Sequence, residues 1–218
     1  GFISLNKVDS EIHNYIQNSI ENTLRDLLIC KNLFRNNPGE KILDSYKYIP
    51  DQDWGNLFNK KSRTLRKSYS LNIQNYFTKY LEKILNVNVE IRDILMLGYP
   101  SFAFRIVRPL HSSDIGAMHA DQWFIDIGET KEEKLSNSSQ LLKFWLPIEV
   151  DSRTSNLLLI PYSHKNRDNY KYDVLETKTG LKPVIKNNLN KNDIHMIDNK
   201  NGNPVIFHMD LIHGGALN

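Results

Sequence analysis

The spacing of apolar residues changes at about residue 88, and this change limits the folds open to the chain. Before it, apolar side chains recur every three or four residues over 12–28 and 70–86, the pattern of amphipathic helices. After it, short β-branched runs separated by turn residues predict strands near 90–98, 102–108, 141–150, 156–162, 193–198 and 204–212. We therefore expect a mainly β fold with flanking N-terminal helices.

The length of the chain fits one domain. Its 218 residues are enough to enclose a sizeable core. We expect residues 1–88 to form a helical flank of this single domain and residues 89–218 to form its β core. Long loops are expected at 111–118, 129–140 and 163–192, and function often resides in such loops on a β scaffold.

Charge and cysteine content argue against several classes of protein. The 28 Lys and Arg residues exceed the 25 Asp and Glu residues by three, and the two signs are interspersed, so no nucleic-acid partner is expected. Cys30 is the only cysteine, which excludes an internal disulfide and makes a reducing, cytoplasmic location the expectation. No apolar stretch approaches the roughly 18 residues of a membrane span, so no membrane partner is expected either.

Motifs of the commonest enzyme classes are absent from the sequence. It contains no G-x-S-x-G nucleophile elbow, no phosphate-binding glycine loop and no dinucleotide fingerprint. Hydrolase, kinase and dehydrogenase chemistries are therefore disfavoured. The distribution of histidine and aspartate is more informative.

Two His-x-Asp pairs occur, His119-Ala120-Asp121 and His208-Met209-Asp210. On an extended segment, side chains two residues apart leave the same face, so an imidazole and a carboxylate can converge on one cation. If residues 205–213 form a regular strand, His213 points to the face opposite His208 and Asp210. We therefore expect His213 to join the first pair rather than its own neighbours.

Two histidines and one carboxylate are the facial ligand set of non-haem Fe(II) oxygenases, which leaves three positions open on the metal. Zinc accepts the same atoms in a tetrahedral site, so the residues alone leave both metals open. In either case we expect the ligand atoms of His119, Asp121 and His213 to lie within about 2.0–2.3 Å of one ion.

Three segments, in this order, resemble the phytanoyl-CoA dioxygenase family of 2-oxoglutarate oxygenases. The first runs from Phe104 to Trp123 and contains the first His-x-Asp pair. The second runs from Phe144 to Lys165 and includes a Pro-x-Ser-His stretch in which Tyr162 stands where the family usually has glycine. The third runs from Val205 to Gly215, with Asn218 beyond it.

The resemblance implies a double-stranded β-helix, a cupin-like jelly roll whose metal lies inside one mouth. It also implies that His119, Asp121 and His213 hold Fe(II), with 2-oxoglutarate and O₂ as co-substrates. Related halogenases lack the carboxylate, so the presence of Asp121 favours hydroxylation. The expected substrate is a small polar molecule, such as a sugar or a precursor of a secondary metabolite.

The same resemblance suggests further site residues. Arg108 aligns with a basic position that can face the 2-oxoglutarate carboxylate, and Lys143 and Asn218 are further candidates for cofactor contacts. Gln122 and Trp123 are candidates for substrate contacts. In the family, an arginine on the strand after the distal histidine grips the cofactor. Because the sequence stops at Asn218, we expect the native protein to continue and to supply that strand.

Two other functions share these features. A cupin-like, metal-dependent isomerase or lyase would use the same ligands without an oxidant. A jelly-roll binding protein would keep the barrel without catalysis, although the intact His119, Asp121 and His213 argue against it. Succinate release under oxygen distinguishes the dioxygenase from both.

Overall fold

The computed structural model describes residues 1–35, 39–58, 62–93, 95–128, 140–150, 156–177 and 180–216. The chain divides into two compact units. The β unit comprises Gly1–Val8 and Val107–Asn218, and the helical unit comprises Asp9–Ile106. All described strands lie in the β unit. Among the described residues, helix accounts for 37% and strand for 18%, so helix outweighs strand and the strand content is modest.

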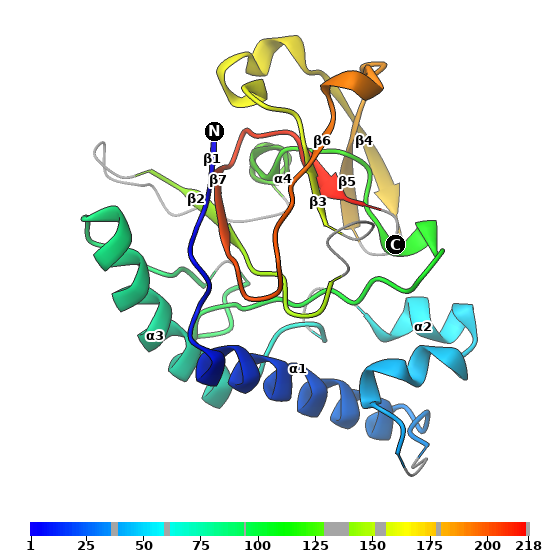
Figure 1. Ribbon diagram of the computed structural model, residues 1–218. Coiled ribbons are helices and arrows are strands. Elements are labelled where there is room, and N and C mark those ends of the chain that lie inside the picture. The colour runs from blue at the N-terminus through cyan, green and yellow to red at the C-terminus, as the bar shows by residue number, and fades with distance from the viewer. Residues whose placement is uncertain are drawn as a thin grey trace. The chain divides into compact units, whose positions relative to one another are not determined.

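The described helical unit contains the helices α1 (Ser10–Cys30), α2 (Asp51–Leu57) and α3 (Lys67–Leu85) and the 3-10 helix η1 (Ile42–Lys47) (Figure 1). Both predicted amphipathic stripes are confirmed as helices, α1 and α3. Their apolar faces turn inward: Leu24 and Leu28 of α1 have no exposed surface and pack with Trp54 of α2. Among the described residues, no helix is long and apolar enough to cross a membrane.

Strands were wrongly predicted at 90–98 and 102–108. In the first segment, Asp93 accepts hydrogen bonds from the backbone N–H of Gly98 (2.6 Å) and the hydroxyl of Ser101 (2.7 Å), and the described residues form no strand. Side-chain acceptors of this kind compete with a strand ladder for the backbone. In the second segment only Ala103 forms a β-bridge, with Thr64.

The strands of the β unit form three small antiparallel sheets (Figure 1). In the first, β7 (Val205–His208) lies between β1 (Phe2–Ser4) and β2 (Leu142–Trp145). In the second, β3 (Leu157–Leu159) lies between β6 (His195–Met196) and β8 (His213–Gly215). The third is a hairpin of β4 (Tyr172–Thr177) and β5 (Gly180–Ile185). The consecutive strands β7 and β8 therefore belong to different sheets.

Each of the predicted strands 141–150, 156–162, 193–198 and 204–212 contains a shorter observed strand. The loop expected at 163–192 is wrong in part, because it contains the β4–β5 hairpin. Four of the six β4 residues are exposed, including Val174 and Leu175, so no buried face gives the segment a clear alternation. The N-terminal strand β1 was not predicted either.

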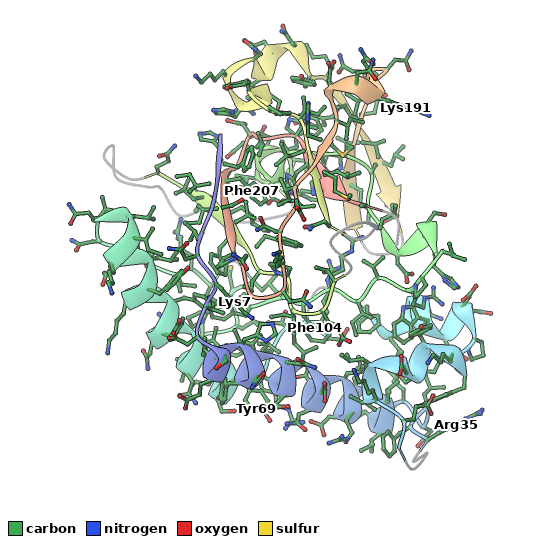
Figure 2. The ribbon with its side chains drawn as sticks, in the orientation of Figure 1. Lys7, Arg35, Tyr69, Phe104, Lys191 and Phe207 are labelled. Carbon is green, nitrogen blue, oxygen red and sulfur yellow. The ribbon has the colours of Figure 1, made fainter. Side chains whose placement is uncertain are left out.

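Two apolar clusters form the core of the β unit. The first surrounds β7 and contains Phe207, labelled in Figure 2, together with Leu211. The second joins Ala120 and Trp123 to Ile212. These buried residues are close in sequence to the three predicted metal ligands, so core packing fixes the backbone from which those ligands project.

Candidate metal centre

The three predicted ligands come together in the β unit. His119, Asp121 and His213 each offer one ligand atom, and these atoms lie within 4.8 Å of one another. His119 Nε2 is 3.8 Å from Asp121 Oδ1, and His213 Nε2 is 3.7 Å from Asp121 Oδ2. These separations exceed hydrogen-bond lengths, so the atoms face one another without bonding.

A single β-bridge brings the two histidines together. The backbone N–H of His119 donates to the carbonyl of His213 at 2.9 Å, and the N–H of His213 donates to the carbonyl of His119 at 2.8 Å. The centroids of their rings are consequently 4.6 Å apart. Asp121 follows as the first residue of the short helix α4 (Asp121–Asp126).

The local structure that produces this convergence differs from the predicted one. The segment from His119 was expected to be extended through Asp121, but helix α4 begins there, and its Gln122 N–H bonds the carbonyl of Met209 at 3.1 Å. The regular strand expected over 205–213 is also wrong. It ends at His208, where a turn intervenes before β8. The triad therefore forms through the bridge and the turn rather than through strand parity.

The second His-x-Asp pair is engaged elsewhere. The ring Nδ1 of His208 accepts the backbone N–H of Asp210 at 3.1 Å, which stabilises the turn after β7. The Asp210 carboxylate faces Arg167, with Oδ1 3.4 Å from Nε. Among the described residues, the only cluster that meets the geometry for a metal ion is that of His119, Asp121 and His213.

Backbone carbonyls set the tautomers of both histidines. His119 Nδ1 lies 2.8 Å from the carbonyl oxygen of Ala117, and His213 Nδ1 lies 2.9 Å from that of Leu211. A carbonyl only accepts, so each Nδ1 must carry the hydrogen. In that tautomer the lone pair of Nε2 faces Asp121, the arrangement found in metal-binding histidines.

Charge at the centre is set by burial and by Lys143 of β2. Burial lowers the pKa of His213 from 6.5 to about 4, against the opposing effect of Asp121. Burial also opposes ionisation of Asp121, but nearby positive charge, first that of Lys143, holds the pKa of Asp121 below its usual value of 3.8. His213 is neutral above about pH 5. Lys143 is therefore a principal counter-charge to Asp121 at neutral pH.

The donor set fits a divalent cation. Asp121 Oδ2 is buried without a hydrogen bond from the described residues, and the ammonium of Lys143, 3.2 Å away, makes an ion pair with it rather than a well-directed hydrogen bond. Two imidazole lone pairs face the same carboxylate. Buried acceptors gathered in this way repel one another unless a cation or proton lies between them.

The other predicted cofactor residues have different surroundings. The Arg108 side chain is 3% exposed and pairs with Asp114 through two hydrogen bonds, Nε–Oδ2 at 2.8 Å and Nη2–Oδ1 at 2.9 Å. Its guanidinium thus has a structural partner, and its contact with 2-oxoglutarate stays a prediction. Lys143 lies at the centre itself. Asn218 lies outside the described residues, as does most of the loop expected at 129–140.

The two predicted substrate residues lie on α4. The side-chain amide of Gln122 donates to Asp126 at 3.2 Å. Trp123 is 1% exposed and stacks on Tyr172, with ring centroids 4.7 Å apart. Trp123 is therefore a core residue in this structure, and a role for it in binding substrate stays a prediction.

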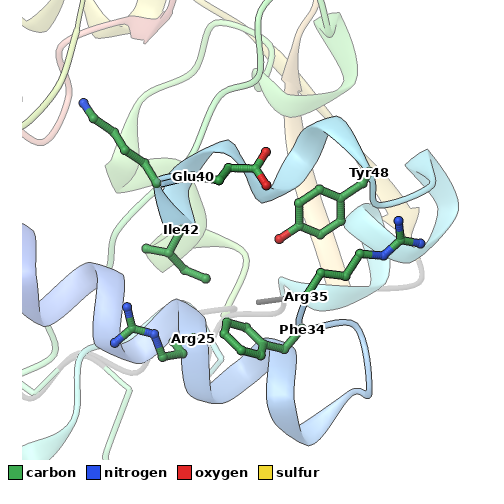
Figure 3. Close-up of a pocket in the computed structure, with 7 residues that line it drawn as sticks. Arg25, Phe34, Arg35, Glu40, Ile42 and Tyr48 are labelled. Atoms are coloured by element: carbon green, nitrogen blue, oxygen red, sulfur yellow. The ribbon is translucent and has the colours of Figure 1, made fainter. Parts of the chain in front are cut away.

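A separate pocket of about 170 Å³ lies in the helical unit (Figure 3). Arg25, Arg35 and Glu40 contribute charged side chains to its lining, and the guanidinium of Arg35 lies 5.1 Å from the centroid of the Tyr48 ring. Burial, and then the charge of Glu40, raise the pKa of the Tyr48 hydroxyl. The pocket has no metal-ligand cluster among its described residues, so it offers no competing centre.

Sequence reasoning missed two residues beside the centre, Ser163 and Arg167. Ser163 belongs to the Pro-x-Ser-His stretch, which was the available signal. It follows Tyr162, whose φ of 62° is the left-handed conformation that favours glycine. Arg167 gave no signal, because its partners Asp126 and Asp210 are distant in sequence.

No protein-family model and no curated protein matches the chain. The functional assignment therefore depends on the chemistry of the centre, because a fold alone does not define a function.

Proposed function

We propose that this chain is an Fe(II)- and 2-oxoglutarate-dependent dioxygenase that hydroxylates a small polar molecule. The observation that carries the proposal is the convergence of His119, Asp121 and His213 with both Nε2 lone pairs turned toward the carboxylate. Two imidazoles and one carboxylate form the ligand set of the non-haem Fe(II) oxygenases. The resemblance of three ordered segments to the phytanoyl-CoA dioxygenase family points the same way.

Iron would be held by Nε2 of His119, Nε2 of His213 and the carboxylate of Asp121. When bound together, iron, 2-oxoglutarate and O₂ supply the oxidation of a C–H bond, with 2-oxoglutarate converted to succinate and CO₂. The protein supplies fixed geometry. The hydrogen bonds from Nδ1 to Ala117 and Leu211 hold each imidazole in place before the metal arrives.

Lys143 gives the centre a site for an anion. Its side chain is 41% exposed, and its ammonium contacts a carboxylate that is 14% exposed, so the lysine reaches from solvent to the centre. A carboxylate of 2-oxoglutarate is the anion we propose for it. Aromatic rings shield the histidines: Phe124 meets His119 edge to face at 5.4 Å, and Phe207 lies 4.6 Å from the ring centroid of His213.

The proposed fold is a jelly roll. Its support is the alternation of strands between the first two sheets: β2 and β7 pair in one, whereas β3 and β8 pair in the other. Two facing antiparallel sheets with a metal at one end are the architecture of the double-stranded β-helix. His213 begins β8 and so stands at the end of a strand, where functional residues of such folds often lie.

Succinate formation tests this function. Purified protein is loaded with Fe(II) without oxygen, then given 2-oxoglutarate, O₂ and a panel of small polar metabolites. We expect succinate from the wild type, more of it with the true substrate, and none from Asp121→Ala. Metal binding without succinate under every condition would refute the dioxygenase and favour a cupin-like isomerase or lyase, or a zinc protein.

A further inference from the structure

One short segment of the β unit, Ile160–Arg167, contacts both parts of the chain that carry the metal ligands. One part is the turn 209–212, which leads into His213. The other is helix α4, which begins with Asp121. Ser163 contacts the turn, and Arg167 contacts both the turn and the helix.

Ser163 holds the turn next to His213. The backbone N–H of Ile212 donates to Ser163 Oγ at 2.8 Å, and the carbonyl of Ile212 accepts the N–H of Ile160 at 2.9 Å. Both backbone groups of Ile212 are thus bonded to this segment. Ser163 is 1% exposed, so removing its hydroxyl would leave the Ile212 N–H buried without an acceptor.

Arg167 connects the turn to the helix. Its guanidinium pairs with Asp126 at the last turn of α4, and its Nε lies 3.4 Å from Oδ1 of Asp210. The Arg167 side chain is 46% exposed, and the side chains of Asp126 and Asp210 are 27% and 16% exposed, so the guanidinium bridges the two carboxylates at the surface of the unit. The planar guanidinium has donors on more than one edge, so it can contact two carboxylates at once, whereas an ammonium is a single point charge.

The centre needs such support before metal binds. Asp121 and the Nε2 lone pairs of both histidines all face the same space, and the Lys143 ammonium, 3.2 Å from Asp121, offsets the repulsion at the carboxylate. The repulsion that remains is opposed by the His119–His213 bridge, the bond from Gln122 N–H to Met209, and the contacts of Ser163 and Arg167.

We propose that Ser163 and Arg167 are positioning residues that pre-organise the metal centre. Their contacts in the described part of the chain are with the backbone of Ile212 and with Asp126 and Asp210, and they act on the ligands through these groups. This inference rests on the proposed centre binding a metal, and it does not depend on 2-oxoglutarate or on turnover.

Binding of Co(II) alone tests the inference. The dissociation constant and the visible absorption of the bound ion are measured for wild type, Arg167→Gln, Arg167→Lys and Ser163→Ala. We expect Arg167→Gln and Ser163→Ala to weaken Co(II) binding about 10- to 100-fold, as is typical when groups supporting metal ligands are lost. Arg167→Lys should fall between Arg167→Gln and wild type. A changed Co(II) spectrum at saturation would show altered ligand geometry.

Lys186→Gln is the matched control. It removes an ion pair of 2.7 Å with Asp173 on the β4–β5 hairpin, in the same unit. We expect it to leave both the affinity and the spectrum unchanged. If Arg167→Gln lowers only the unfolding temperature of the metal-free protein, with wild-type affinity and spectrum, Arg167 has a merely structural role and the inference fails.

Two outcomes remain distinguishable. If the wild type binds no Co(II), the proposed centre itself is refuted. If the wild type binds Co(II) and the variants bind it equally well, only the positioning role is refuted. Should Arg167→Gln fail to fold, Asp126→Asn and Asp210→Asn each remove one contact of the guanidinium and carry the same test.

Discussion

At the scale of single residues, the tautomers of two histidines decide what the centre can bind. A ring with its hydrogen on Nε2 would point a donor at Asp121, as in an ordinary histidine–aspartate pair, and would have no lone pair there for a metal. The carbonyls of Ala117 and Leu211 draw the hydrogens to Nδ1 instead, so His119 and His213 both present lone pairs. This tautomer, more than the presence of histidine, distinguishes a candidate metal centre from a structural ion pair.

The first prediction concerns these rings. His119→Gln and His213→Gln should each weaken Co(II) binding by more than about 100-fold, because removing a ligand costs more than removing a group that supports one. His195→Gln, an exposed position on β6, is the control and should bind Co(II) like the wild type. Isothermal titration provides the measurement. Equal binding by all three variants would show that the ion is held elsewhere.

The second prediction concerns Lys143. Its positive charge should weaken the binding of a divalent metal and strengthen the binding of 2-oxoglutarate. Lys143→Met keeps the length of the side chain and removes its ammonium. Binding of divalent metal should become several-fold tighter, because a cation 3.2 Å from Asp121 no longer competes with the metal. Binding of 2-oxoglutarate to the metal-loaded protein should weaken about 10- to 100-fold, the loss of a charge-assisted hydrogen bond.

Separate titrations of metal and of 2-oxoglutarate check this split, with Lys186→Met as a control for the loss of one surface lysine. Changes of the same sign in both affinities would argue for a general disturbance of the site. An unchanged affinity for 2-oxoglutarate would remove Lys143 from the anion site.

At the scale of elements, the helices could be predicted and several strands could not. Helices α1 and α3 each bury one apolar stripe, to which Leu24 and Phe77 belong. The residues of such a stripe recur every three or four positions, so the sequence shows it. Strands β4 and β5 have only one buried residue between them, Pro183, so their sequence carries no clear alternation to detect. The short strand β1 depends on pairing with β7, two hundred residues away in sequence, which local pattern cannot show.

The convergence of His119, Asp121 and His213 was predicted correctly, although from partly wrong local structure, and their binding of a metal stays a prediction. The spacing of His119 and Asp121 indicated a shared ligand site, although the segment turns into a helix between them. The side chains of His213 and His208 were predicted to point to opposite faces of one strand, whereas in the structure a turn separates the two residues. Supporting groups such as Ser163 escaped notice, because a hydroxyl that bonds a distant backbone N–H leaves no local pattern.

The third prediction concerns the loop that leads from Arg108 toward His119. In this loop Arg108 and Asp114 form a buried ion pair. Burial alone would raise the pKa of Asp114, but the hydrogen bonds and charge of Arg108 hold it below 3.8. Asp114→Asn leaves the guanidinium without its counter-charge and should reduce the free energy of unfolding by about 3 kcal/mol near neutral pH. Urea denaturation of wild type and variant measures the difference.

The pH dependence of that difference follows from the direction of the shift. A carboxyl with a depressed folded-state pKa contributes stability above its unfolded pKa and loses it as pH falls toward the folded value. The gap between wild type and Asp114→Asn should therefore stay constant from pH 7 to about pH 5 and narrow below about pH 4. A gap that widens in acid would contradict the assigned ion pair.

At the scale of the whole molecule, the chain has two units with separate apolar cores. Trp54 and Leu24 belong to the core of the helical unit, whereas Phe207 and Leu211 belong to that of the β unit. All three proposed metal ligands lie in the β unit. A bound metal therefore stabilises that unit directly, and how far its effect spreads depends on whether the chain unfolds as one cooperative domain.

The last prediction uses the location of the proposed metal ligands in only one of the two units. At a free Co(II) concentration of 100 times the dissociation constant, binding adds about 2.7 kcal/mol to the stability of whatever unfolds cooperatively with the site. Because each unit has its own core, we expect hydrogen exchange to slow at backbone amides of the β unit, among them His119 and His213, and to stay unchanged in α1 and α3. Asp121→Ala with the same Co(II) controls for weak binding elsewhere and should show no slowing. Equal slowing in both units would instead establish the single cooperative domain that the length of the chain suggests.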